Sequence, residues 1–572
     1  MDHLPVELLA SIFVLGAADQ LEDSPFLLRP DEDHCPASSV TDFQLLVSHV
    51  CQHWRQVALR ISCLWTSLHF REPAHIARAE AFLARVSTNH SLDILVDTVS
   101  VEDHIPGVTL CRDEMHTIFA LITPHVARWR AFHLKVRANE CKLIARHALS
   151  TCGPAPRLET LQLYHFEDFR TSQNLYIATY RAPVVIFDNV LPALKNVSLI
   201  GVNLPWAHAP YLQHLHALEL ALHTDSIRPP YDAWAAMLCR STSLRRLLLH
   251  YSGPRAADDH NTRICVPALE ELSLTDLDPE HLARLLYTLE LPRLTTLTLD
   301  LPDQDYAQDY TGVVEMIAGV STVAVSAVTS TNAFPAAQLP ITALHTLRIT
   351  ALECAPSALG ALLRRLTSLR VLELDFARIR SPSAICDVLL ETVAPSSDAN
   401  VNSEDVARCD CTNSRRVPVL PRLEEARLFG LAGERVRALL TLRRRFAEGC
   451  RGDCAEVEGE AEDLEYPASS ASSSYSSRSS EAAADLTPVA AVSEVSGGNA
   501  KLHEHGRAAM PRFVVRYSPR QRGKDAVLEQ LVRQGRVELV EEDGEDEYVN
   551  AGEDSSEDED AREGEGEDGS GE

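Results

Sequence analysis

One arrangement of apolar and polar positions recurs through the middle of the chain. Leucine, or another apolar residue, stands at the first, fourth and sixth positions of each copy, with mostly polar residues between. Because the side chains of a strand point alternately to its two faces, each copy predicts a short strand buried on one side. Copies begin at Leu158, Leu194, Leu215, Leu244, Leu269, Leu294, Leu344 and Leu369, with a degenerate copy at Leu423 and an irregular first copy at Trp129.

The spacing of these copies indicates a structural repeat. From Leu244 to Leu294 the copies follow at intervals of 25 residues, and the next interval, to Leu344, is 50 residues. We therefore expect a further copy halfway, where valines stand at positions 320, 323 and 325. The interval from Leu344 to Leu369 is again 25 residues, but the others are uneven, so the repeat is expected to be irregular.

Apolar residues at helical spacing fill stretches between the copies, for example from Leu282 to Leu286 and from Leu359 to Leu366. A period of about 20–29 residues with this strand pattern is the signature of leucine-rich repeats. No single strand–helix unit can close a core, so stacking of the units must supply it. We predict an irregular leucine-rich-repeat-like α/β solenoid over residues 71–448. The alternative is an α/β array that merely reuses strand–helix units.

Polar residues between and just after the apolar anchors should face the concave side of the solenoid. Their mixture of charges suits the surface of a protein target better than a phosphate polymer. A solvated sheet face without a partner would show polar residues as well. The candidate target-binding residues are Tyr164, Arg246, His250, Glu271, Asp300, Arg348, Glu373, Asp375 and Arg427.

The first 70 residues have a different, helical pattern. A helix should open at Leu4-Pro5 and end near Gly16, because proline suits the first helical position and glycine often ends a helix. The polar, proline-containing stretch 19–42 predicts a loop, and a second helix follows to about Ile61. A unit this small cannot bury its large apolar side chains alone and needs a partner or a larger domain.

These residues resemble the F-box. The similar positions are Leu4-Pro5-x-Glu7, Val50-Cys51-x-x-Trp54, Ala58 and Leu64-Trp65, and the pattern looks most like F-box proteins of mushroom-forming fungi. The resemblance implies that residues 1–70 dock on the Skp-type adaptor of a cullin ubiquitin ligase. The residues that would contact the adaptor, or support the contacts, are Leu4, Pro5, Leu8, Ile12, Val50, Trp54 and Trp65.

Two departures from the F-box pattern bear on adaptor affinity. The loop 19–42 is longer than the usual link, and Ser62-Cys63 stands where the family often has a proline. An ordinary N-terminal helical hairpin packed on its own chain is the alternative interpretation.

Composition shifts again after residue 448. Residues 449–510 include a serine-dominated stretch and are expected to be disordered. Residues 511–540 have the pattern of a strand, a helix and a strand, which predicts a terminal cap that rejoins the solenoid after this insertion. Residues 541–572 hold 17 acidic residues and one basic residue, which predicts a disordered acidic tail. The whole chain is thus expected to be α+β, with a helical F-box, the solenoid, the insertion and the tail.

Charge and motif content narrow the function classes. The 572 residues carry a net charge of -29, and no basic footprint predicts nucleic-acid binding. No apolar run reaches the roughly 20 residues of a membrane span, and no signal peptide is evident, so a cytoplasmic and/or nuclear protein with reduced cysteines is expected. Phosphate-loop and nucleophile-elbow motifs are lacking, so neither catalysis nor a cofactor is expected. The spacing of Cys409, Cys411, Cys450 and Cys454 does not favour a metal site.

Together these patterns favour a substrate receptor of an SCF-type ubiquitin ligase. The F-box would bind the Skp-type adaptor, and through it a cullin, while the solenoid would hold a target protein. A scaffold that binds the adaptor without promoting degradation is the alternative. An enzyme with a degenerate catalytic motif is the least favoured hypothesis.

Overall fold

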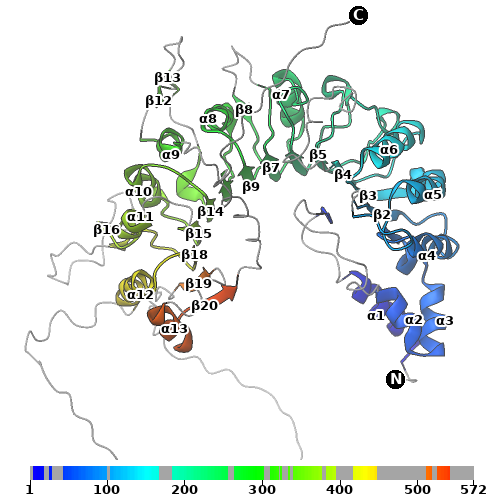
Figure 1. Ribbon diagram of the computed structural model, residues 1–572, viewed down its shortest axis with the longest axis horizontal. Coiled ribbons are helices and arrows are strands. Elements are labelled where there is room, and N and C mark those ends of the chain that lie inside the picture. Colours follow the sequence, from blue (N-terminus) through cyan, green and yellow to red (C-terminus); the bar gives the residue numbers. More distant parts are fainter. Residues whose placement is uncertain are drawn as a thin grey trace, which may run out of the picture.

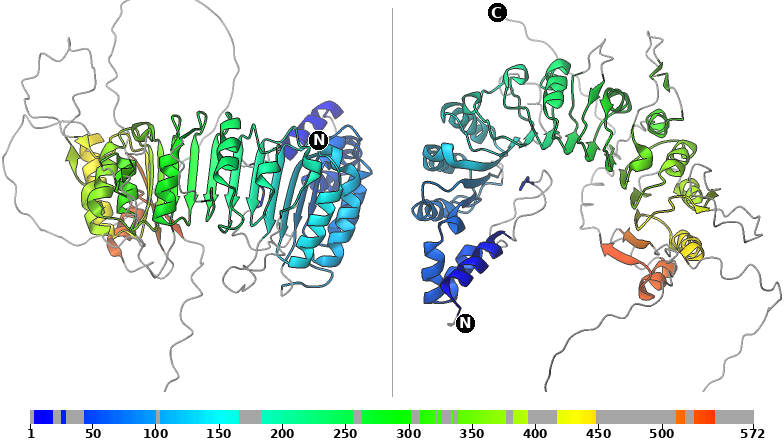
Figure 2. Two further views of the ribbon diagram at one scale, coloured as in Figure 1. Left: turned by 90° about the horizontal axis from the view of Figure 1, so that it is seen from above. Right: turned by 180° about the vertical axis from the view of Figure 1, so that it is seen from behind.

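The computed structural model shows an open arc, with a parallel sheet lining its inner side and helices covering its outer side (Figure 1). Its two ends face each other across the opening (Figure 2). One end is formed by the helices α1 (Val6–Ala18), α2 (Phe43–Val50) and α3 (Gln52–Arg60), and the other by the terminal unit of β19 (Arg512–Tyr517), α13 (Ala526–Arg533) and β20 (Glu538–Glu541). The structure describes residues 4–18, 25–28, 43–99, 103–165, 183–255, 263–301, 309–320, 323–324, 333–334, 339–376, 382–393, 417–447, 511–517 and 525–541.

Fourteen strands of the described residues form one sheet in which every neighbouring pair is parallel. Their order in space follows the order in the chain, as stacking of successive units requires. The strands are β1 (Ser67–Phe70), β2 (Leu92–Asp97), β3 (Trp129–Val136), β4 (Thr160–His165), β5 (Asn196–Ile200), β6 (Ala217–Ala221), β7 (Arg246–His250), β9 (Glu271–Thr275), β11 (Thr296–Asp300), β14 (Thr346–Thr350), β15 (Val371–Asp375), β18 (Glu425–Phe429), β19 (Arg512–Tyr517) and β20 (Glu538–Glu541).

The predicted apolar anchors stand side by side along this sheet. Leu247 of β7 pairs with Leu272 of β9, which pairs in turn with Leu297 of β11. All three side chains are buried between the sheet and the outer helices. A shift of one residue in any strand would turn its leucines to the concave side, so burial fixes the register. The leucine-rich-repeat-like solenoid expected from the sequence is the fold that these residues adopt.

The outer helices begin where the local sequence offers caps. Asp278 caps α8 by accepting a hydrogen bond from the backbone N–H of His281 at 2.9 Å, and Pro279 occupies the first turn. Glu114 of α5 accepts from the backbone N–H of Cys111 at 3.0 Å. The outer helices are α4 (Ala74–Leu83), α5 (Arg112–Ile122), α6 (Asn139–Thr151), α7 (Tyr231–Arg240), α8 (Pro279–Thr288), α9 (Thr311–Ala318), α10 (Pro356–Arg365), α11 (Pro382–Leu389) and α12 (Gly433–Ala447).

The copy expected at valines 320, 323 and 325 does not form a strand of the main sheet. Strand β11 pairs with β14 over its full length, from Thr296 to Asp300, so no strand lies between them. The described piece β12 (Val323–Ala324) pairs antiparallel with β13 (Ala333–Phe334) instead, and position 325 lies outside the described residues. The prediction of a hidden copy was wrong because equal spacing does not decide which strands pair.

The N-terminal helices differ from the prediction in two places. Helix α1 (Val6–Ala18) runs past Gly16, where a Cβ atom would lie 2.4 Å from Cζ of Phe43, so this glycine allows close packing rather than ending the helix. The predicted second helix is two helices, α2 (Phe43–Val50) and α3 (Gln52–Arg60). Cys51 between them is extended, and its Sγ accepts a hydrogen bond from the backbone N–H of Trp54 at 3.4 Å.

The solenoid begins earlier than residue 71, because β1 already pairs with β2 in the main sheet. Neither strand was expected from the leucine pattern. At the other end, β18 pairs with β19 and β19 with β20, so the strand, helix and strand around α13 (Ala526–Arg533) continue the sheet. The predicted insertion 449–510 and nearly all of the tail 541–572 lie outside the described residues.

Asp525 joins this terminal unit to α12. Its Oδ2 accepts from the backbone N–H of Gly433 at 2.6 Å, and its Oδ1 accepts from the N–H groups of Val527 and Leu528, each at 3.1 Å. Asp525 thus caps α13 and also holds the helix against its neighbour. A Cβ on Gly433 would approach the backbone nitrogen of Leu528 to 2.7 Å, which leaves little room for any other arrangement.

Replacing Asp525 with alanine should loosen the terminal unit. Loss of a helix cap costs about 0.5–2 kcal/mol, and Gly433 would lose its acceptor as well. We expect amide hydrogens of α13 and β20 to exchange at least fivefold faster, while those of β7 and β9 are unchanged. Gln530→Ala, at an exposed position of the same helix, is the matched control. Equal exchange in the two variants would contradict the role of Asp525.

Candidate functional site

Exposed apolar side chains gather in the N-terminal helices. Nine of the sixteen exposed large apolar residues of the described chain lie before residue 60. Leu8, Ile12 and Leu15, with exposed fractions of 54%, 48% and 69%, follow helical spacing on α1. Leu9 and Phe13 on the other side of α1 are buried in the main core. The nine residues, here called the N-terminal apolar surface, are Leu4, Val6, Leu8, Ile12, Val14, Leu15, Leu46, Val50 and Leu59.

Of the seven residues expected to contact an adaptor, five are exposed and the two tryptophans are half-buried or buried. Leu4, Pro5, Leu8, Ile12 and Val50 are exposed.

The two tryptophans of that set support the unit from within. Trp54 is half-buried and packs against Phe13 with ring centroids 5.1 Å apart. Trp65 is buried, donates a hydrogen bond from Nε1 to the carbonyl oxygen of Ala58 at 3.1 Å, and packs edge-on against Phe82 of α4. Trp65 therefore fixes the helices to the first unit of the solenoid.

The concave face carries a ladder of charges in its C-terminal half. Glu373 of β15 stands between Arg348 of β14 and Arg427 of β18, with nitrogen–oxygen distances of 3.6 and 3.5 Å. Arg427 also donates from Nε to Glu425 at 2.7 Å, and this hydrogen bond raises the pKa of its guanidinium. Arg246 and Glu271 form a similar pair at 3.1 Å. These partly exposed ion pairs are worth little for stability, so they leave charged groups available to a partner.

The other residues predicted for the concave face differ in how far they are exposed. His250, Asp300 and Asp375 are partly exposed at the ends of their strands. Tyr164 lies on the concave side too, but it is only 2% exposed. It is covered because Leu28, from the loop between α1 and α2, packs against it. Tyr164 is thus on the concave face, with Leu28 between its side chain and the solvent.

A row of polar side chains beneath Leu28 was missed at the sequence level. His133, Gln162, Ser198 and Glu219 occupy matching positions on β3, β4, β5 and β6. Ser198 donates to Glu219 at 2.6 Å, and Gln162 donates to the hydroxyl of Tyr164 at 2.8 Å. Their positions within the leucine pattern predict the concave side, but burial of three of them depends on the covering segment.

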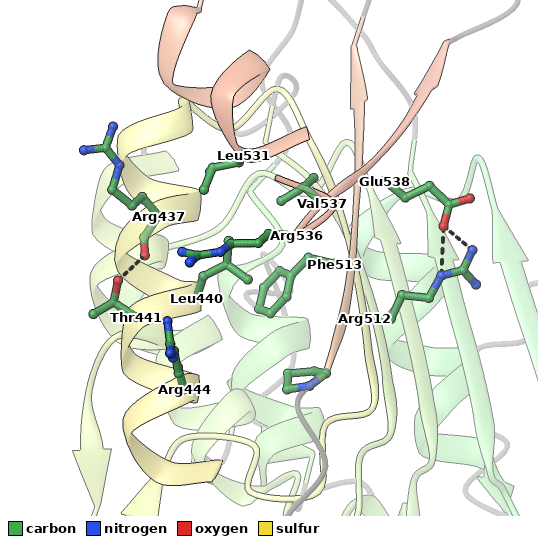
Figure 3. A pocket seen from close by; sticks show the side chains of 12 residues that line it. Arg437, Leu440, Thr441, Arg444, Arg512, Phe513, Leu531, Arg536, Val537 and Glu538 are labelled. Carbon is green, nitrogen blue, oxygen red and sulfur yellow. Dashed lines mark hydrogen bonds and ion pairs between the residues drawn. The ribbon is translucent and has the colours of Figure 1, made fainter. Parts of the chain in front are cut away.

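A cavity of about 910 Å³ lies between α12 and the terminal unit (Figure 3). Leu440, Phe513 and Leu531 supply apolar walls, and the arginines 437, 444, 512 and 536 surround them. Arg512 is paired with Glu538 through a hydrogen bond from Nε at 2.9 Å. This combination of apolar walls and guanidinium groups suits a ligand with an apolar body and a negative charge.

Two further properties concern only the described part of the chain. No group of three or more His, Cys, Asp or Glu side chains there could hold a metal ion. No helix there is long and apolar enough to cross a membrane. The four cysteines considered as zinc ligands lie outside the described residues.

The fold and these surfaces define a mixed α/β protein with a leucine-rich-repeat-like solenoid. This architecture is consistent with a protein-interaction repeat domain. No family model and no curated protein match the chain. Among solved structures, the TLR13–ssRNA13 complex is similar at a TM-score of 0.29 and 12% sequence identity, over 63% of this chain and 39% of that one. The chain therefore spans about two fifths of the length of that protein.

Proposed function

We propose that this protein is the substrate-recognition subunit of an SCF-type E3 ubiquitin ligase. The observation that carries the proposal is the N-terminal apolar surface, which coincides with residues of the F-box resemblance. Large exposed apolar groups concentrated on one small unit mark a protein interaction site. Covering half-exposed side chains such as Leu8 and Ile12 would contribute about 1 kcal/mol each to binding of a Skp-type adaptor.

The rest of the chain suits the receptor part of this role. The unit of α1–α3 is fixed to the solenoid through Trp65, so a target on the concave face would be held at a set distance from the adaptor. Holding two reactants close together is itself a large source of rate acceleration. In this proposal the protein performs no bond chemistry, needs no cofactor or metal, and acts in the cytoplasm or nucleus, where the adaptor and a cullin would be its partners.

The double variant Leu8→Asp, Ile12→Asp tests the adaptor site. Both side chains are exposed, so the charges should leave the fold intact but oppose burial under a partner. We expect at least 100-fold weaker binding to a purified Skp-type adaptor, measured by calorimetry. Trp54→Ala is a less direct test, because Trp54 also packs on Phe13.

Leu143→Asp is the matched control, since Leu143 is 51% exposed on α6 outside the N-terminal unit. It should bind the adaptor as the wild type does. Failure of the wild type to bind, or unchanged binding of the folded double variant, would refute the adaptor assignment. Binding without any change in the half-life of proteins captured by the solenoid would instead favour the non-degradative scaffold.

A further inference from the structure

Residues 25–28, Pro-Phe-Leu-Leu, lie against the concave face although they belong to the connection between α1 and α2. In Figure 1 they are the short dark-blue piece inside the arc. Phe26 and Leu28 are 8% and 3% exposed. A stretch of chain that buries a leucine on a sheet face in this way is in the position of a bound peptide.

The backbone of Leu28 is held by one side chain. Its N–H donates to Oε1 of Gln162 at 3.0 Å, and its carbonyl oxygen accepts from Nε2 of Gln162 at 2.8 Å. This pair of bonds matches what a neighbouring strand would offer an extended peptide. Since only backbone groups are recognised, the bonds could be made to any residue in an extended segment.

Neighbouring side chains hold the Gln162 amide in this orientation. Nδ1 of His133 lies 2.7 Å from Oε1 of Gln162. Nε2 of Gln162 donates a hydrogen bond to the hydroxyl of Tyr164 at 2.8 Å. Gln162 is fully buried beneath this segment, and its amide oxygen and nitrogen are both hydrogen-bonded to the Leu28 backbone. The Gln162 amide is thus positioned to bind the backbone of an extended peptide.

The apolar part of the site selects a large aliphatic residue. Leu28 packs with Leu95, Tyr164, Ile200 and Ala221, which form a cluster distinct from the main core on the other side of the sheet. Leu27 and Leu222 are partly buried against the same cluster. Because the main core does not include this cluster, the solenoid should stay folded when the segment is released.

We propose that the concave face over β4–β6 is a binding site for an extended peptide with a large aliphatic residue, and that residues 25–28 occupy it as an internal competitor. The proposal deepens the receptor role, and rests on it only in assigning the peptide to a target protein. A tethered segment acts at an effective concentration of about a millimolar, so a target must displace it and binds more weakly than it otherwise would.

The experiment frees the site by changing Phe26, Leu27 and Leu28 to serine in the full chain. The probe is a fluorescent synthetic peptide with the sequence of residues 23–30, and binding is followed by fluorescence anisotropy without adaptor. We expect saturable binding to the freed variant at least tenfold tighter than to the wild type. A peptide with serine in place of Leu28 should bind at least tenfold more weakly.

Gln162→Met in the freed background tests the backbone recognition. It removes both bonds to the peptide with little change of volume, and should weaken binding at least tenfold. Thr298→Met, at the matching position of β11 outside the site, is the control and should bind as the freed variant does. If the triple variant does not fold, Leu28→Ser alone serves in its place.

Three results would overturn the proposal. They are absence of binding to a freed variant that melts as the wild type does, equal affinities of freed and wild-type protein, and no effect of Gln162→Met. Because the adaptor is not needed, failure here is distinct from failure of the adaptor assignment.

Discussion

Trp129→Ala should lower the free energy of unfolding by about 3–5 kcal/mol, the range found when a buried aromatic residue is truncated. Trp129 is fully buried at the start of β3. Its ring stacks on Phe132 with centroids 4.6 Å apart and meets Phe187 edge-on at 5.9 Å. Its Nε1 donates to the carbonyl oxygen of Ile122 at 3.3 Å. The change would leave a cavity and an acceptor without its donor at a junction of three units.

Urea denaturation followed by circular dichroism measures this loss. Trp129→Phe is the control, because it keeps a stacked ring while losing the Nε1 donor, and we expect a loss of about 1–2 kcal/mol. Because a solenoid can unfold in parts, the free energies of unfolding are compared for the unfolding transition of the part that contains β3. If the alanine and phenylalanine variants unfold at the same urea concentration as the wild type, Trp129 does not hold these units together.

Stability should fall as the pH is lowered from 6.5 toward 4, because of His223. Burial lowers the pKa of this imidazole from 6.5 to about 4, with a smaller contribution from Arg228. The ring is fully buried between Ser252 and the carbonyl oxygen of Val202, each 3.0 Å from a ring nitrogen. In this window the unfolded chain binds the proton and the folded protein does not, so protonation favours unfolding.

The expected loss is at most about 3 kcal/mol over this window, from about 1.4 kcal/mol for each unit of pKa shift. Urea denaturation of wild type and His223→Gln at several pH values between 4 and 8 would measure it. The variant should show a shallower decline below pH 6.5. Between pH 7.5 and 8 the two proteins should have parallel profiles, since His223 is neutral in both states. Parallel profiles at all pH values would refute the prediction.

The solenoid could be predicted because its pattern is local. Each copy places two leucines on one side of a five-residue strand, and neighbouring strands repeat the arrangement. Leu247 and Leu272 therefore paired as the pattern required. The copy expected around position 323 was not found in the main sheet. Which strands pair depends on how the units stack, and here β11 pairs directly with β14.

The candidate surfaces were predictable only in part, for the same reason. Exposed Leu8 and Ile12 follow from helical spacing in a unit too small to bury both of its faces. The contact between Leu28 and Gln162 joins residues 134 positions apart. No local pattern indicates such a pair, although three apolar residues within a polar, proline-containing loop were a signal. Burial of Tyr164 could not be predicted, because Leu28, which covers it, is remote in sequence.

The alignment of β18 with β19 has a consequence for how this chain can change over generations. The two strands pair directly although residues 448–510 stand between α12 and the terminal unit. Each doubling of the number of residues that separate two contacting segments costs only about 0.6 kcal/mol in loop-closure entropy, so the separation of these strands along the chain can change at little cost. A shift of one residue within either strand, by contrast, would expose its buried side chains. Selection should therefore tolerate insertions and deletions between the two strands while holding the strands themselves to constant length.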